Sequence, residues 1–325
     1  MESKSIIKVN FSEINFKNAT PIYSMSKNRL SINSIDFKNE LFLVSSDDNT
    51  IEIYDFIKGK LLYSYSDSLN GTLNTHFIKR DNTIIYSTKT DYSIIIYDYL
   101  KKEYLFQMFS HLNYINEIIY NEINNILISK DNSGLSYIWN ISSFQNEIFL
   151  ESKHCLENIS SCVIDYLGEY IYSVKKLESN QSEIMVFNIS YNHENELIIK
   201  NSSLTLFNSI QQEIIKIKVS NDNKYLILLY EHLISINDIS DKNSVRKVKE
   251  IQINDKLLNI EISPDSKMFI VTDIIGKYSG FFFNNLNLIF SKRLHFTSCK
   301  GVKFSQKYNI FATYGDKVVI CRLNF

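Results

Sequence analysis

Residues 41–55 read LFLVSSDDNTIEIYD, and this stretch sets the pattern for the rest of the chain. It contains an apolar run, a polar turn and an alternating segment that ends in an aromatic residue followed by aspartate. Alternation with a period of two is typical of a strand with one buried face, and β-branched and aromatic side chains suit a pleated sheet. The stretch therefore predicts two antiparallel strands joined by a short turn.

The same strand ending recurs along the chain. The seven residue pairs that mark it begin at Tyr54, Tyr97, Trp139, Phe187, Asn237, Phe283 and Cys321. Successive pairs are 38 to 50 residues apart, close to the roughly 40–45 residues of a four-stranded propeller blade. Each pair also follows an alternating strand and a second apolar strand, and precedes a more variable outer strand. The chain is therefore predicted to be all-β, a seven-bladed β-propeller with four-stranded antiparallel blades.

The repeats divide one predicted domain, residues 1–325, into an N-terminal segment and seven blades. The closing segment is 1–30, and the blades cover approximately 31–68, 69–109, 110–150, 151–206, 207–250, 251–292 and 293–325. The last unit reaches Phe325 after only three strands, which would leave an unpaired sheet edge. We expect the N-terminal segment to pair with the last blade as its missing outer strand. A tandem of β-sandwiches would also give many short strands, but not seven near-regular repeats.

Composition argues against several function classes. With 35 basic and 36 acidic residues, the net charge of -1 gives no overall attraction to nucleic acid or to a membrane surface. No uninterrupted apolar run reaches the length of a membrane span, and the four cysteines form no CxxC pair. We therefore expect a soluble, intracellular protein without metal or cofactor, with no membrane association and no direct binding to nucleic acid. With only 8 Gly and 2 Pro, turns must rely on Asn, Asp, Ser and Lys.

The third blade carries His111, Ser129 and Trp139 in the order found in WD repeats, which form a buried hydrogen-bond network from His, Ser or Thr, Asp and Trp. Ser133 occupies the usual Asp position, and Asp131 lies two residues earlier, so a rearranged network is expected. A His–Ser–Asp set also suggests a hydrolase. We favour the structural interpretation, because buried polar networks commonly specify a fold.

Other polar positions have local interpretations. Asp48 precedes Tyr54 by six residues, where WD repeats place a turn aspartate, and it is predicted to close a tight turn. Residues 177–183 (LESNQSE) and 191–203 (YNHENELIIKNSS) lengthen the fourth and fifth blades. We interpret them as surface loops that tolerated insertion, with a partner contact as the alternative.

One family resemblance rests on residues 32–120. The matching segments are INSIDF (32–37), SSDDNTIEIYD (45–55), GKLL (59–62), Gly71, RDNTIIYS (80–87) and KKEYLFQMFSHLNYINEI (101–118). They resemble the WD-repeat subunit of the COMPASS histone methyltransferase, which is shared with the mRNA cleavage and polyadenylation factor and with a nuclear phosphatase complex. The resemblance implies a nuclear, non-catalytic scaffold for histone methylation, or for mRNA 3′-end cleavage, polyadenylation and transcription termination. It also implies protein subunits of those complexes as partners, with one copy of this chain in a hetero-oligomer.

Partner contacts are expected on the loops that enter each inner strand. The candidates chosen by position are Arg29, Asn70, His111, Tyr114, Lys256, Phe296 and Lys300. The same fold would also serve a ubiquitin-ligase substrate receptor or another RNA-processing scaffold. A propeller enzyme would need clustered acids, histidines or metal ligands, and the sequence shows no motif of that kind.

Overall fold

The computed structural model describes residues 18–25, 31–67, 71–141, 152–177, 181–193, 196–210, 212–241 and 245–324. Every regular element in these ranges is a β-strand, and the strands form seven antiparallel sheets of four strands each. The predicted fold class, an all-β seven-bladed β-propeller, is confirmed. No helix in the described ranges is long and apolar enough to cross a bilayer.

The blades are numbered in chain order. Blade one consists of β2 (Ile32–Lys38), β3 (Leu41–Ser46), β4 (Thr50–Asp55) and β5 (Lys60–Ser66). Blade two consists of β6 (Thr75–Phe77), β7 (Thr83–Ser87), β8 (Ile94–Asp98) and β9 (Glu103–Met108). Blade six consists of β22 (Leu257–Ile262), β23 (Met268–Asp273), β24 (Lys277–Phe282) and β25 (Leu288–Arg293). Blade seven consists of β26 (Gly301–Phe304), β27 (Ile310–Tyr314), β28 (Val318–Asn324) and β1 (Asn18–Met25).

The three remaining blades come from the middle of the chain. Blade three consists of β10 (Ile115–Asn121), β11 (Ile126–Asp131), β12 (Ser136–Asn140) and β13 (Ser152–Leu156). Blade four consists of β14 (Ile159–Ile164), β15 (Tyr170–Lys176), β16 (Ser182–Tyr191) and β17 (Leu197–Ile210). Blade five consists of β18 (Lys216–Val219), β19 (Tyr225–Leu229), β20 (Leu233–Asp238) and β21 (Arg246–Gln252).

The chain forms two compact units. Residues 1–107 with 258–325 hold blades one, two, six and seven, and residues 108–257 hold blades three, four and five, with Met108 and Leu257 at the boundaries. Within the first unit, apolar clusters pack blade six on seven, seven on one, and one on two. Within the second, they pack blade three on four and four on five. Since each cluster joins two blades, no blade buries its apolar faces alone.

Burial falls from the middle strands of a blade to its outer strand. Strand β8 is buried at every position, whereas β21 is exposed at nearly every position. This gradient explains the sequence pattern, because a strand covered on both faces reads as an apolar run and a solvated edge strand does not.

Asparagine replaces glycine in many of the turns. Six asparagines adopt positive φ values between 51° and 65°: Asn39, Asn49, Asn82, Asn125, Asn158 and Asn223. Among residues with a side chain, asparagine tolerates this left-handed conformation best, since its short amide can hydrogen-bond locally. The expectation that turns would form with little glycine therefore holds at these six positions.

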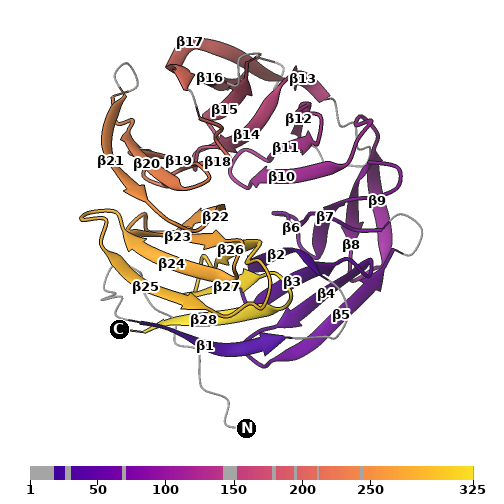
Figure 1. Cartoon of the computed structure of the whole chain (residues 1–325). Helices are drawn as coiled ribbons and strands as arrows, with labels where there is room; N and C mark the ends of the chain where they lie inside the picture. Colours follow the sequence, from indigo (N-terminus) through magenta and orange to yellow (C-terminus); the bar gives the residue numbers. More distant parts are fainter. Residues whose placement is uncertain are drawn as a thin grey trace. The chain divides into compact units, whose positions relative to one another are not determined.

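Strand β1 completes the last blade, as predicted. It pairs antiparallel with β28 from Asn18↔Asn324 to Met25↔Val318, with one register shift between Pro21 and Tyr23. Figure 1 shows the first strand of the chain lying along the last strand, at the outer edge of blade seven. The pairing leaves β1, and not β28, as the edge strand of this sheet.

The loop interpretation of residues 191–203 is wrong for most of the segment. Strand β16 extends to Tyr191 and β17 begins at Leu197, so the two form a long hairpin. The reason is the apolar run at 197–199, in which Leu197 is buried in the cluster between blades three and four. Of residues 177–183, the structure describes 177 and 181–183, and the last two belong to β16.

Candidate functional site

His111 anchors the loop that connects β9 to β10. Its ring is buried, with 1% of the side chain exposed. Its Nδ1 lies 3.0 Å from Asp131 Oδ2, and its Nε2 lies 2.7 Å from Ser129 Oγ. The indole Nε1–H of Trp139 donates to the same Ser129 oxygen at 2.9 Å. The structure thus brings together all four residues that the sequence placed in a network.

The direction of each hydrogen bond follows from the partners. A carboxylate can only accept, so Nδ1 of His111 carries the proton and donates to Asp131. Nε2 then accepts from the Ser129 hydroxyl, which in turn accepts from Trp139. A neutral imidazole satisfies every hydrogen bond in this network.

Asp131 takes the role of the aspartate that WD repeats usually place six residues before the tryptophan, where this chain has Ser133. Its Oδ1 accepts from the amides of Ser133 at 2.9 Å and Leu135 at 3.1 Å, and from the Ser133 hydroxyl at 2.6 Å. Its other oxygen holds His111. One carboxylate therefore closes the β11–β12 turn and fixes the β9–β10 loop. A rearranged network of this kind was expected because Ser133 stands at the usual aspartate position.

The environment sets the protonation states of both partners. Burial lowers the pKa of His111, and the Asp131 carboxylate, which acts in the opposite direction, does not offset this effect. Burial raises the pKa of Asp131, but hydrogen bonds from Ser133, His111 and the Leu135 amide together hold it below its usual value. The folded state therefore favours a neutral His111 beside an ionised Asp131.

The anchored loop presents apolar side chains to solvent. Leu112, which follows His111, is 83% exposed, and Phe109 and Tyr114 are 66% and 47% exposed. The Tyr114 carbonyl accepts from the Asn132 amide at 3.0 Å, which ties the end of the loop to the β11–β12 turn. Three large exposed apolar residues within six positions make this loop a candidate interaction surface.

Blade seven repeats this construction, which the sequence pattern did not predict. His295 lies in the β25–β26 loop with Nδ1 3.0 Å from Asp316 Oδ1 and Nε2 2.9 Å from Thr313 Oγ1. Burial lowers the pKa of His295 against the effect of Asp316. A signal was present, because a hydroxyl residue follows each histidine by 18 positions: Ser129 after His111, and Thr313 after His295.

Phe296 stands in this second loop as Leu112 stands in the first. It directly follows the anchoring histidine, is also 83% exposed, and lies with its ring centroid 4.8 Å from Lys317 Nζ. The loop rests on two positions where a side chain would not fit. A Cβ on Gly276 would come within 2.3 Å of the His295 carbonyl oxygen, and a Cβ on Gly315 within 2.2 Å of the Ser298 oxygen.

The remaining predicted residues do not gather into one site. Asp48 closes the β3–β4 turn by accepting from the Thr50 amide at 3.1 Å. Lys256 pairs with Glu231 at 2.7 Å, and Lys300 donates through Nζ to the Ile32 carbonyl at 3.2 Å. Arg29 and Asn70 lie outside the described residues.

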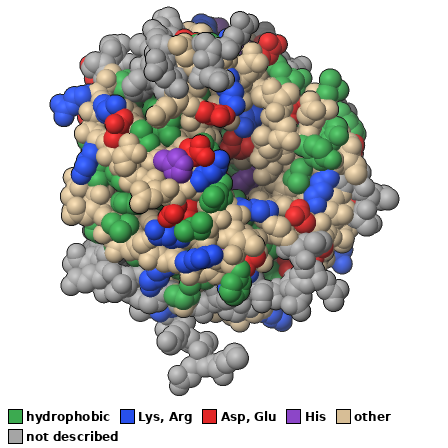
Figure 2. All heavy atoms as spheres, in the orientation of Figure 1, with side chains coloured by type: hydrophobic (Ala, Val, Ile, Leu, Met, Phe, Trp, Pro, Cys, Tyr) green, Lys and Arg blue, Asp and Glu red, His purple; other side chains and the backbone are tan. Residues whose placement is uncertain are grey.

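The His–Ser–Asp set of blade three has no open side for a substrate. Ser129 has none of its surface exposed, and its hydroxyl is occupied by His111 and Trp139. Across the ranges that the structure describes, no group of three or more His, Cys, Asp or Glu side chains could hold a metal ion. On the face seen in Figure 2, basic and acidic side chains are interspersed, without a continuous stripe of one sign.

No protein-family model matches the chain. A search of curated proteins found no match either.

Proposed function

We propose that this chain is a non-catalytic WD-repeat adaptor that binds protein partners through its anchored loops. The observation that carries the proposal is the repeated arrangement in blades three and seven. In each, a buried histidine holds the loop, and the next residue, Leu112 or Phe296, points a large apolar side chain into solvent. Leaving such side chains exposed is unfavourable unless a partner covers them.

The anchoring explains why these loops suit binding. Association costs conformational entropy when a loop must be ordered, and loops that are already fixed avoid part of that cost. Fully desolvated apolar and aromatic side chains typically supply most of the binding energy of an interface. Leu112 and Phe296 each follow a histidine that is held by buried hydrogen bonds, and a partner that covers them would desolvate them.

The finer proposal concerns the complex. On the resemblance of residues 32–120, we propose a nuclear complex that acts in histone methylation, or in mRNA 3′-end cleavage, polyadenylation and transcription termination. The buried polar network around Ser129 supports a structural role for its His–Ser–Asp set and thus a scaffold without an active site there.

Affinity purification of the tagged chain from nuclear extract tests both the adaptor role and the proposed complexes. Recovery of methyltransferase or cleavage-factor subunits would support the finer proposal. A ubiquitin ligase or another RNA-processing assembly would support the adaptor role and contradict the named complexes. Recovery of no protein partner would contradict the adaptor role itself.

Point variants test the loops. Leu112→Asp or Phe296→Asp should lower partner recovery by about tenfold, the size of a hot-spot loss. Leu288→Asp is a matched control, because Leu288 is 55% exposed and lies on the outer strand β25. Equal recovery with all three variants would show that the partner uses another surface.

A further inference from the structure

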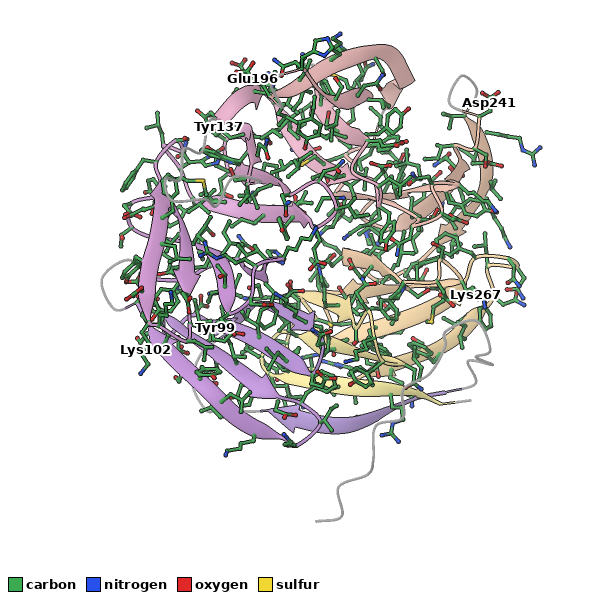
Figure 3. All side chains as sticks on the ribbon, turned by 180° about the vertical axis from the view of Figure 1, so that it is seen from behind. Tyr99, Lys102, Tyr137, Glu196, Asp241 and Lys267 are labelled. Carbon is green, nitrogen blue, oxygen red and sulfur yellow. The ribbon has the colours of Figure 1, made fainter. Side chains whose placement is uncertain are left out.

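A groove of about 270 Å³ opens on the side of the first unit, between strands β4 and β5 of blade one and strands β7 and β8 of blade two. Four tyrosines line it: Tyr63 and Tyr65 from β5, and Tyr97 and Tyr99 at the end of β8. Lys102, in the β8–β9 turn, lines it as well. Figure 3 shows Tyr99 and Lys102 near one another at this edge of blade two.

The tyrosines form two contacting pairs, here called steps, along the groove. Tyr97 and Tyr99 are nearly buried, at 2% and 7% exposed, and Tyr63 and Tyr65 are partly exposed. Tyr65 and Tyr97 have ring centroids 4.4 Å apart, and Tyr63 and Tyr99 have centroids 5.1 Å apart. The two tyrosines that come from the same strand are two residues apart, so the two steps are separated by about 7 Å. Tyr104, which is 54% exposed, stands edge-on against Tyr97 and exchanges a hydroxyl hydrogen bond with Tyr65.

The spacing matches a peptide in the polyproline II conformation. Such a peptide has three residues per turn and rises about 3.1 Å per residue, so residues i and i+2, on two neighbouring edges of the helix, lie about 6 Å apart along its axis and can contact the partly exposed Tyr63 and Tyr65. Aromatic-lined grooves bind proline-rich segments in this way, since the peptide is already extended and loses little entropy.

Hydrogen-bond donors are available at the same place. Neither the Tyr63 nor the Tyr99 hydroxyl forms a hydrogen bond with another described residue. Burial, with the neighbouring Tyr63, raises the pKa of Tyr99 to about 12, so this hydroxyl is protonated at neutral pH and can donate. A polyproline II backbone has no internal hydrogen bonds, which leaves its carbonyls free to accept.

The charge of the groove selects among such peptides. Lys102 is the charged member of the described lining, and no carboxylate lines the groove. An acidic residue beside the prolines would therefore be attracted and a basic one repelled.

Neither proline of this chain lies in a proline-rich segment. This chain contains 2 prolines; Pro21 lies in β1 and Pro264 in the turn between β22 and β23. We propose that the groove binds an acidic, proline-rich segment of a partner protein in the polyproline II conformation. The groove shares no lining residue with the loops of Leu112 and Phe296, and the proposal does not depend on the adaptor role.

The test is direct binding of a fluorescein-labelled oligoproline peptide that ends in two glutamates, followed by fluorescence anisotropy with the full chain. Saturable binding is expected. Tyr104→Ala and Lys102→Glu should each weaken it by about fivefold or more, and added salt should weaken binding to the unaltered chain.

Matched controls separate the groove from general surface effects. Tyr166→Ala removes a tyrosine of similar exposure, 52%, from the other unit. Lys267→Glu reverses a lysine that Figure 3 shows far from Lys102 on the same unit. Neither control should change the Kd, and circular dichroism melting of every variant would show that each is folded.

Two results would overturn the proposal. One is the absence of saturable binding by the oligoproline probe. The other is equal binding of a glycine–serine peptide with the same two glutamates, which would indicate charge attraction or strand addition at the free edge of β5.

Discussion

A neutral imidazole donates one hydrogen bond and accepts another, and both buried histidines use this property in the same direction. His111 and His295 each donate from Nδ1 to an aspartate and accept at Nε2 from a hydroxyl. The result is a loop fixed by side-chain chemistry in a chain with only 8 glycines and 2 prolines to shape its turns.

Removing one of these imidazoles should destabilise the fold. His111→Ala deletes two buried hydrogen bonds and leaves Asp131 without one of its donors, so the free energy of unfolding should fall by about 2–4 kcal/mol. Thermal melting followed by circular dichroism measures the effect. His193→Ala is the control, because His193 is exposed and its replacement should change stability by less than about 0.5 kcal/mol. Equal melting temperatures for the two variants would contradict the structural role.

The same histidines predict a dependence of stability on pH. Burial holds both folded pKa values below the ordinary 6.5, so the unfolded chain binds more protons in the window just below pH 6.5. The stability that the two neutral histidines contribute is complete above about pH 6.5 and is lost as the pH falls toward their pKa values in the folded state. Asp131 stays ionised in this window, because its pKa is lowered from 3.8.

Melting temperatures at several pH values between about 7.5 and 5 measure this loss. The chain should melt at progressively lower temperature as the pH falls, and a His111→Gln, His295→Gln double variant should show a shallower slope across the same window. A slope that is identical in the double variant would assign the pH dependence to other groups.

Sequence periodicity predicts the positions of many strands correctly. The INSIDF segment at 32–37 is strand β2, and the run TIIYS at 83–87 is β7. Alternation and apolar runs report burial, and burial in these sheets is set by the position of a strand within its blade. The hairpin of β16 and β17 was not predicted, since its polar residues outnumber the buried Leu197 that holds it in place.

The binding features were harder to predict for a physical reason. The second histidine network lacks a tryptophan on its third strand, where Cys321 stands, so the sequence marker was missing. The tyrosine groove is assembled from residues about 35 positions apart that meet only when blade one packs on blade two. Strand patterns are local, whereas both features depend on contacts between elements.

The turn between β23 and β24 offers a test of how elements support the Phe296 loop. Gly276 has a φ of 85°, and an added Cβ would meet the carbonyl oxygens of His295 and Thr297 at 2.3 and 2.4 Å. Gly276→Ala should therefore cost about 2–4 kcal/mol, from backbone strain plus displacement of the loop.

Gly59→Ala separates these two causes. Gly59 also has a positive φ, 65°, but is exposed, so its replacement should cost only about 1 kcal/mol from strain. Chemical denaturation of both variants measures the difference, and equal losses would show that the loop contact adds nothing.

Closure of blade seven pairs β1, near the beginning of the described residues, with β28 at their end. Deleting residues 1–25 removes β1 and exposes the backbone edge of β28, so the melting temperature should fall sharply. A synthetic peptide of residues 18–25 added to the truncated chain should recover part of the loss, because strand addition can restore the same backbone hydrogen bonds.

Differential scanning calorimetry with and without the peptide measures both effects. A truncated chain that melts at the unaltered temperature would show that β1 contributes no stability. A peptide that leaves the truncated chain unchanged would show that pairing needs the covalent connection.

This pairing also has a consequence for biosynthesis. Strand β1 leaves the ribosome about 290 residues before β28. At roughly 5–20 residues per second, it waits about 15 to 60 s for the strand that it pairs with. Throughout that interval, residues 18–25 of the nascent chain lack the strand with which they pair. Chaperone protection from aggregation therefore matters most in the seconds before translation ends.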